Sequence, residues 1–161
     1  MVEPFASEDM FTGPPVDDAL IAETEKRLGY RLPSSYLDVL RRTNGGSLRR
    51  RRCPTSFPTS WADDHFEVRS LIGIGGARGI DSNGGHGSKD MIAEWGYPDI
   101  GIVLFDMPSG GHDAVMLDYR ECDGDAEPSV VYLDEDRVPR RVARDFAEFL
   151  GLLVESGDSR V

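Results

Sequence analysis

The segment GIVLFDMPSGGHDAVMLDYRECDGDAEPSVVYLD (residues 101–134) contains three short apolar runs, at residues 101–106, 114–119 and 129–134. Each run is bounded by residues typical of turns, such as Gly, Pro, Asp and Ser, and runs of this length favour β-strands. The connections between them are too short to contain a crossover helix, which a parallel pair of strands requires. We therefore expect an antiparallel meander, with residues 101–106 as a central strand.

Four amphipathic segments around these strands have the spacing of helices. The first two span residues 17–29 and 33–46, each with Gly at its exit. A short helix is expected from Ser88, as its N-cap, to Gly96, with Trp95 turned toward the core. In the last segment, PRRVARDFAEFLGLLVE (residues 139–155), the apolar residues lie on one stripe, which makes it the clearest helix in the chain.

Residues 66–74 alternate between apolar and polar side chains and predict a further strand that ends at Gly75-Gly76. Two helices, several strands and a closing helix, without regular alternation of strand and helix, predict an α+β domain in which helices cover a mainly antiparallel sheet. We expect residues 1–14 to be a loose N-terminal tail and residues 15–161 to form a single domain.

The chain carries 29 acidic and 18 basic residues, which gives a net charge of −11. This balance disfavours binding to nucleic acid or to an anionic membrane, whereas it suits a basic partner. No segment has the apolar length of a membrane span, and the N-terminus does not resemble a signal peptide, so a cytoplasmic protein is expected. Cys53 and Cys122 have no neighbours at zinc spacing and suggest neither a disulfide framework nor a structural metal.

Two unusual segments have alternative interpretations. The glycine-rich residues 73–87 follow a strand and could cradle a phosphate, but the Lys-Ser/Thr pair of a P-loop and the spacing of a dinucleotide site are missing. A surface connection is the favoured interpretation, and no cofactor is expected. The run Arg49–Arg52 could contact phosphates or a carboxylate-rich partner. A solvated sheet edge is favoured, because four successive side chains of a strand cannot all face one way.

Ser109, His112 and Asp113 are the residue types of a hydrolase triad, but no nucleophile elbow surrounds them. Adjacent side chains in an extended chain point to opposite faces, so His112 and Asp113 are expected to fix the loop and the strand entry. His65 and His86 lie in separate segments without metal-ligand spacing, and metal binding is not expected.

A further group of residues favours protein binding. Trp61 lies beside Asp63 and Asp64 in an expected loop, where an aromatic side chain next to carboxylates can anchor an interface or pack its own loop onto the core. Asp118 faces away from Leu117 and Tyr119 on its strand, and this acidic face can be solvated surface or the site of a cationic partner.

The order of LPSSYLDVLRRTNGG (residues 32–46), GIVLFD, GGHDAVMLDYR, EPSVVYLDED and VARDFAEFLGLL resembles the SUKH superfamily, the SMI/KNR type. The resemblance extends over residues 18–154. It implies an α+β fold with helices against a curved sheet, and no enzymatic activity. It also implies a function through protein partners, because bacterial members resemble immunity proteins that neutralise toxins, many of them nucleases, and fungal members resemble regulators of cell-wall synthesis.

The family's motif residues carry over as positions that define the fold. They are Leu32 and Pro33 at the start of the second helix, Asn44, Gly45 and Gly46 at its end, Asp118 in its strand, and Phe146, Phe149 and Leu150 in the last helix. Many relatives have a Gly-Asp pair where this chain has GGHD. The chain also adds the long glycine-rich connection and the Arg run, at places where a member of the family can set partner specificity.

The leading hypothesis is a cytoplasmic, non-enzymatic immunity protein that binds a basic toxin domain by steric and electrostatic occlusion. The expected contact residues are Trp61, Asp63, Asp64, His112, Asp113 and Asp118. A regulatory adaptor that binds endogenous proteins is the alternative, and a small hydrolase that uses His112 is the third hypothesis.

Overall fold

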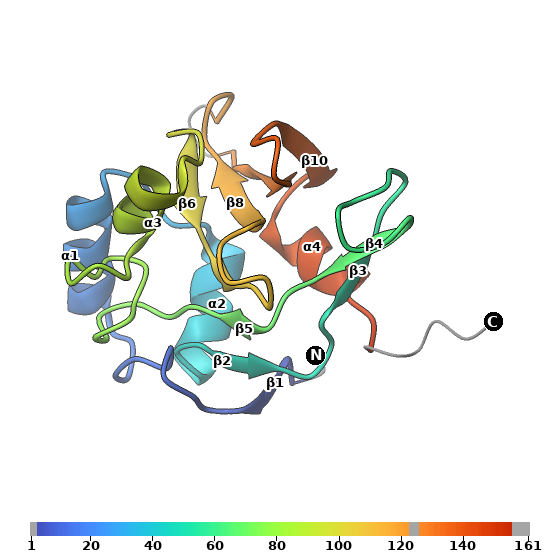
Figure 1. The fold of residues 1–161 in the computed structure, drawn as a ribbon. Coiled ribbons are helices and arrows are strands. Elements are labelled where there is room, and N and C mark those ends of the chain that lie inside the picture. Colours follow the sequence, from blue (N-terminus) through green and yellow to red (C-terminus); the bar gives the residue numbers. More distant parts are fainter. Residues whose placement is uncertain (1–2, 123–125, 156–161) are drawn as a thin grey trace.

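Helices and antiparallel strands are mixed along the chain, which confirms the α+β class. The computed structural model describes residues 3–122 and 126–155 (Figure 1). The helices are α1 (Asp18–Leu28), α2 (Ser34–Arg42), α3 (Ser88–Trp95) and α4 (Phe146–Leu152). The strands are β1 (Phe5–Ser7), β2 (Gly46–Leu48), β3 (Arg52–Pro54), β4 (His65–Glu67), β5 (Ser70–Leu71), β6 (Gly101–Val103), β7 (Phe105–Asp106), β8 (Ala114–Asp118), β9 (Ser129–Leu133) and β10 (Pro139–Ala143).

The expected meander is present as an antiparallel sheet with the strand order β10-β9-β8-β6. The expected central strand at residues 101–106 is divided, because it serves two sheets. The Leu104 N–H donates to the carbonyl oxygen of Val115 in the meander at 3.2 Å, and the Leu104 carbonyl accepts from the N–H of Ile72 at 2.9 Å. The chain thus passes at Leu104 into a second antiparallel sheet, with the order β1-β2-β5-β7.

Strands β6, β8 and β9 of the meander are buried on both faces, which explains why they are almost continuously apolar, whereas β10 is partly exposed. Val115 and Leu117 belong to the larger core, whereas Ala114 and Met116 belong to a smaller one that Met91 of α3 helps to cover. The side chains of a strand alternate between its two faces, so a single apolar run supplies both cores.

Helices α2 and α4 pack together over the larger core. The ring of Tyr36 meets that of Phe146 edge to face, with 5.4 Å between their centroids. The buried Tyr36 hydroxyl donates to the carbonyl oxygen of Ile72 at 2.6 Å. Phe149 is also fully buried, while Leu150 is half-buried and faces a groove described below.

The Asn44-Gly45-Gly46 motif closes α2 by tying three segments together. The buried Asn44 side chain donates to the carbonyl oxygens of Pro14 and Ile74 and accepts from the Ile74 N–H. Gly45 has a φ of 94°, and a Cβ there would lie 2.6 Å from the Gly73 nitrogen. The motif therefore needs an amide side chain that bonds on both sides, and a glycine where backbones approach.

Four local features differ from the expectations. Residues 139–143, which were expected to begin the last helix, form β10, and the helix begins at Phe146. The segment expected to be a loose tail contains β1, which pairs with β2 and buries Phe5. The N-cap of α3 is Gly87 rather than Ser88, whose hydroxyl is buried and accepts from the Val103 N–H at 2.9 Å. Trp95 is 39% exposed instead of turned inward, because α3 ends there and Gly96 reverses the chain.

Across the described ranges, no helix has both the length and the apolar character that are needed to span a lipid bilayer.

Candidate protein-binding site

Three loops that are far apart in the sequence meet at one place on the surface. They are the β3–β4 loop (residues 55–64), the β7–β8 loop (residues 107–113) and the β9–β10 turn (residues 134–138). The Ser60 N–H donates to Asp134 Oδ2 at 2.8 Å, and His112 Nδ1 lies 3.4 Å from Glu135 Oε2. We define the three-loop surface as eight residues from these loops and from the end of α3. Its members are the half-buried Asp134 and the exposed Trp61, Asp63, Asp64, Trp95, His112, Glu135 and Asp136.

Asp113 lies beneath this surface and holds the loops together. It is 2% exposed, and its carboxylate accepts from the hydroxyls of Ser109 and Tyr132, both at 2.6 Å. Burial raises the pKa of Asp113, and hydrogen bonds from Ser109, Tyr132 and Trp61 offset part of the rise. Asp113 thus joins the loops from inside and is not available for direct contact with a partner.

Arg137 fastens the β9–β10 turn to the neighbouring loop and helix. Its guanidinium donates to the carbonyl oxygens of His112 at 2.7 Å, Trp95 at 3.1 Å and Gly111 at 3.2 Å. It also lies 4.7 Å from the centre of the Tyr97 ring, in a cation–π contact. Arg137 has a φ of 59°, a left-handed conformation that is costly for a residue with a side chain. These bonds hold the turn in place and leave its carboxylates on the outside.

Both tryptophans of the sequence lie on the three-loop surface. Trp61 is 52% exposed and Trp95 is 39% exposed. Both lie beside the β7–β8 loop: Trp61 is close to Asp113, and Trp95 packs so closely on Gly111 that a Cβ there would lie 2.8 Å from the indole. An exposed indole on a fixed backbone can bury a large area at a small entropic cost when a partner binds.

The charged groups around the two indoles are mainly acidic. Asp63, Asp64, Glu135 and Asp136 are exposed. Asp64 contacts the Nδ1 of His65 at 2.8 Å, and Asp136 pairs with Arg140 at 2.9 Å. The carboxylates outnumber the cationic groups on this surface, so it combines exposed aromatic side chains with a negative charge.

The structure separates Asp118 from the other expected contact residues. Asp118 ends β8, whereas Asp113 precedes that strand at its opposite end. Burial raises the pKa of Asp118, but hydrogen bonds and the charge of Arg120 outweigh that effect, and the net pKa is lowered. Asp118 therefore forms a local ion pair with Arg120, at 2.8 Å, away from the three-loop surface.

The alternative chemistries find little support in the geometry. In the glycine-rich connection, the amides of Gly75 and Gly85 donate to the carboxylates of Asp81 and Asp90, which would repel a phosphate. The Ser109 hydroxyl donates to Asp113, while His112 faces Glu135, so these residues do not form a triad. Within the described ranges, no group of three or more His, Cys, Asp or Glu side chains is placed to hold a metal ion.

The structure brings four of the six expected contact residues together on the three-loop surface. Trp61, Asp63, Asp64 and His112 were expected to contact a partner, and they belong to it. Trp95 and the acids at residues 134–136 were missed. The pattern YLDED, in which three carboxylates directly follow a buried strand, was the available signal for the acids. No sequence signal indicated that α3 would end beside the β7–β8 loop.

The comparisons with known proteins identify a family. Residues 15–151 match the family model described as SMI1 / KNR4 family (SUKH-1). This range contains the whole three-loop surface and ends within α4. No curated protein matched the chain.

Proposed function

The chain belongs to the SMI1/KNR4 family (SUKH-1), and on this premise we propose that it is a non-enzymatic protein-binding domain that acts as an immunity protein. In this proposal it binds a basic toxin domain, such as a nuclease, in the cytoplasm and neutralises it by occlusion. The contact is made through the three-loop surface. Asp118 is left out of the contact, because its carboxylate is engaged by Arg120.

The observation that carries the proposal is the placement of both exposed indoles on one fixed surface. Tryptophan is among the residues that contribute most to binding energy, especially where neighbouring residues exclude water from it. Trp61 and Trp95 both lie beside the β7–β8 loop, which Asp113 and Arg137 hold from inside. Little ordering of the backbone would accompany binding, which favours affinity.

The charge of the molecule supports a basic partner. The net charge is −11, and Asp63, Asp64 and Glu135 place exposed carboxylates on the same surface as the indoles. Complementary fields raise the rate of association and exclude acidic competitors, although they add less to affinity itself. A nuclease surface that binds phosphates would be basic and would suit this surface.

The test begins with capture of the tagged protein's partner from its native lysate at low and at high salt, followed by mass spectrometry. We expect one basic protein in stoichiometric amount, bound more weakly at high salt because salt screens the charges of the three-loop surface. Its toxic activity is then measured with and without the chain, and we expect full protection at equal concentrations.

A charge-matched pair of variants connects the binding to the surface. Asp63→Asn/Asp64→Asn/Glu135→Gln removes three charges from the three-loop surface, and we expect association to slow about tenfold at low salt. The control Asp99→Asn/Glu121→Gln/Glu155→Gln removes three exposed charges elsewhere and should leave the rate unchanged. Equal rates for the two variants would contradict the proposed contact.

The regulatory adaptor gives a different result in the same experiment. In that case, the captured proteins would be housekeeping or envelope-synthesis proteins, and the chain would not inhibit the activity of any of them. This outcome would reject the immunity function and favour the adaptor.

A further inference from the structure

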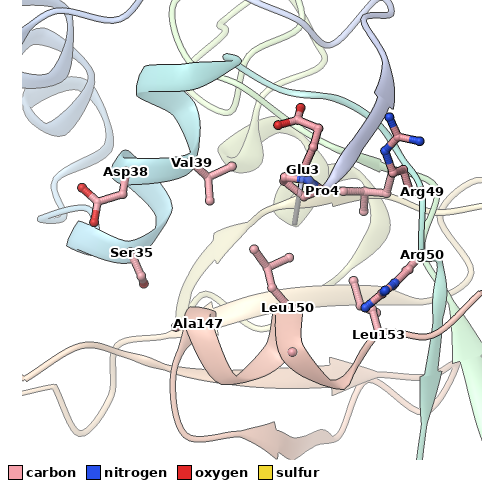
Figure 2. Close-up of a pocket in the computed structure, with 12 residues that line it drawn as sticks. Glu3, Pro4, Ser35, Asp38, Val39, Arg49, Arg50, Ala147, Leu150 and Leu153 are labelled. Atoms are coloured by element: carbon pink, nitrogen blue, oxygen red, sulfur yellow. The ribbon is translucent and has the colours of Figure 1, made fainter. Parts of the chain in front are cut away.

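A groove of about 450 Å³ lies between α2 and α4, beside the segment that leads into β1 (Figure 2). It shares no residue with the three-loop surface. Its walls are mainly apolar, with Val39 from α2, Leu150 from α4 and Leu153 just after α4. Figure 2 shows Leu150 pointing into the groove from α4, opposite Val39. Grooves between two helices with apolar walls are frequent sites for a segment of a partner protein.

Part of the Arg run lies on the rim of this groove. The four arginines differ in their contacts. The Arg51 side chain donates to the carbonyl oxygen of Leu48, and Arg52 forms an ion pair with Glu67 at 3.3 Å. Arg49 and Arg50 are exposed and line the groove. Over the residues that the structure describes, neither guanidinium forms an ion pair. Seven other arginines do, namely Arg27, Arg41, Arg52, Arg69, Arg120, Arg140 and Arg144.

Arg49 and Arg50 thus place two adjacent exposed guanidinium groups, neither of them in an ion pair with another described residue, on one rim of the groove. Glu3 and Asp38 also line the groove, but no ion pair joins either of these described residues to Arg49 or Arg50. The part of the rim at Arg49 and Arg50 therefore offers donors that match carboxylates in geometry and charge. This part of the rim is cationic, whereas the three-loop surface is mainly acidic.

The wall formed by α4 allows close approach. Ala147 and Gly151 are exposed on the side of α4 that faces the groove. A Cβ added at Gly151 would have no other atom within 4 Å, so the space beside it is open. A bound chain can thus reach the apolar side chains of the groove without a clash with the helix.

We propose that the α2–α4 groove binds an apolar peptide segment of a protein partner that carries Asp or Glu side chains. The apolar side chains lie against Val39 and Leu150, and the carboxylates pair with Arg49 and Arg50. The site is a second interface, of opposite charge preference, and it goes beyond the binding of a basic toxin. A protein with both surfaces can hold two partners, or two regions of one partner, at the same time.

The test uses random peptides displayed on phage and selected against the full chain, after which the strongest binders are synthesised and measured by fluorescence anisotropy. We expect the selected sequences to combine apolar residues with Asp or Glu. Arg49→Ala/Arg50→Ala should weaken their binding about tenfold, the loss expected for charge-assisted contacts at a partly exposed site. In the isotope-labelled protein, the amide resonances of Val39 and Gly151 should shift when such a peptide binds.

Two further variants test whether peptide binding depends on the groove itself or on positive charge elsewhere on the protein. Gly151→Glu places a carboxylate in open space, so the fold should be preserved, and peptide binding should fall by a similar factor. Arg31→Ala/Arg141→Ala removes the same number of exposed arginines outside the groove and should have no effect.

The proposal is overturned if the selected peptides lack acidic residues, if none depends on Arg49 and Arg50, or if none is recovered. Asp63→Asn/Asp64→Asn/Glu135→Gln should bind these peptides normally, so failure of the toxin-binding proposal would be seen separately.

Discussion

Asp113 is a buried carboxylate that accepts hydrogen bonds from Ser109 in its own loop and from Tyr132 in β9. Buried carboxylates cost free energy unless their hydrogen bonds are made, and these bonds join the β7–β8 loop to the meander. The residue beside it, His112, points to the surface instead. This single pair shows how adjacent residues with catalytic chemistry can have a structural role and a surface role.

The titration of Asp113 tests its assignment as a buried, structural carboxylate. Burial raises its pKa, whereas Arg120 keeps the pKa of Asp118 low despite the burial of that carboxylate. The folded chain therefore binds the Asp113 proton more tightly than the unfolded chain does. The pKa of Asp113 in the unfolded chain is about 3.9, and in the folded chain it is higher. As the pH rises through this interval, Asp113 ionises, and the free energy of unfolding should fall.

Carbon-13 NMR of the side-chain carboxyl groups measures both residues. We expect the midpoint of Asp113 to lie above that of an ordinary Asp and the midpoint of Asp118 to lie below it. In Asp113→Asn, the corresponding fall in stability with rising pH should be absent. A midpoint for Asp113 below that of Asp118 would contradict the structural assignment.

Arg137→Ala tests the fastening of the β9–β10 turn. The substitution removes donors to the carbonyl oxygens of His112, Trp95 and Gly111. Because these contacts are partly exposed, we expect a loss of about 2 kcal/mol in the free energy of unfolding, measured with urea. Arg141→Ala, at an exposed position on β10, should change the stability by less than about 0.5 kcal/mol. Equal effects of the two substitutions would show that Arg137 does not hold the turn.

Among the elements, the turn that closes α2 is the most demanding in its backbone geometry. Gly45 and Gly29 both have positive φ values, 94° and 80°, and both follow a helix. A Cβ at Gly45 would lie within 3.0 Å of the Gly73 nitrogen and the Phe11 oxygen, whereas a Cβ at Gly29 would meet no atom within 4 Å. A comparison of the two positions therefore distinguishes two free-energy costs of a Cβ atom. One is the cost of the left-handed backbone conformation, and the other is the cost of steric overlap with neighbouring atoms.

Substitution of each glycine by Ala measures those costs. Gly29→Ala should lower the free energy of unfolding by about 1 kcal/mol, the cost of a left-handed residue alone. Gly45→Ala should cost more than about 3 kcal/mol, because backbone atoms of two other segments must move as well. Thermal or urea unfolding gives both values. A Gly45→Ala protein as stable as Gly29→Ala would mean that the close approach is not present in solution.

The elements also show what local sequence can predict. The three runs between residues 101 and 134 predicted the meander, because short apolar runs with short connections leave few other arrangements. The same pattern did not predict the division at Leu104. Hydrophobicity reports that a segment is buried and does not report which strands it pairs with. The N-cap of α3 was placed at Ser88 because its hydroxyl suits a cap, but that hydroxyl bonds to the Val103 N–H instead.

For the whole molecule, the three-loop surface depends on contacts between residues that are distant in sequence. The link from Ser60 to Asp134 joins positions 74 residues apart, and that from Arg137 to Trp95 joins positions 42 apart. Residue type made Trp61, Asp63 and Asp64 candidates, since aromatic and acidic residues in a loop suit an interface. Trp95 was assigned to the core because helical spacing does not reveal where neighbouring elements end.

We propose that a basic partner binds the three-loop surface, and the two tryptophans allow this contact to be observed in solution. The protein is labelled with 5-fluorotryptophan, which gives two fluorine-19 resonances, one each for Trp61 and Trp95. Titration with the unlabelled partner captured from the lysate follows both sites at once. We expect both resonances to shift or broaden up to equal concentrations, and both indoles to lose their exposure to solvent. If both resonances stayed unchanged while the partner was fully bound, the three-loop surface would not be the binding site.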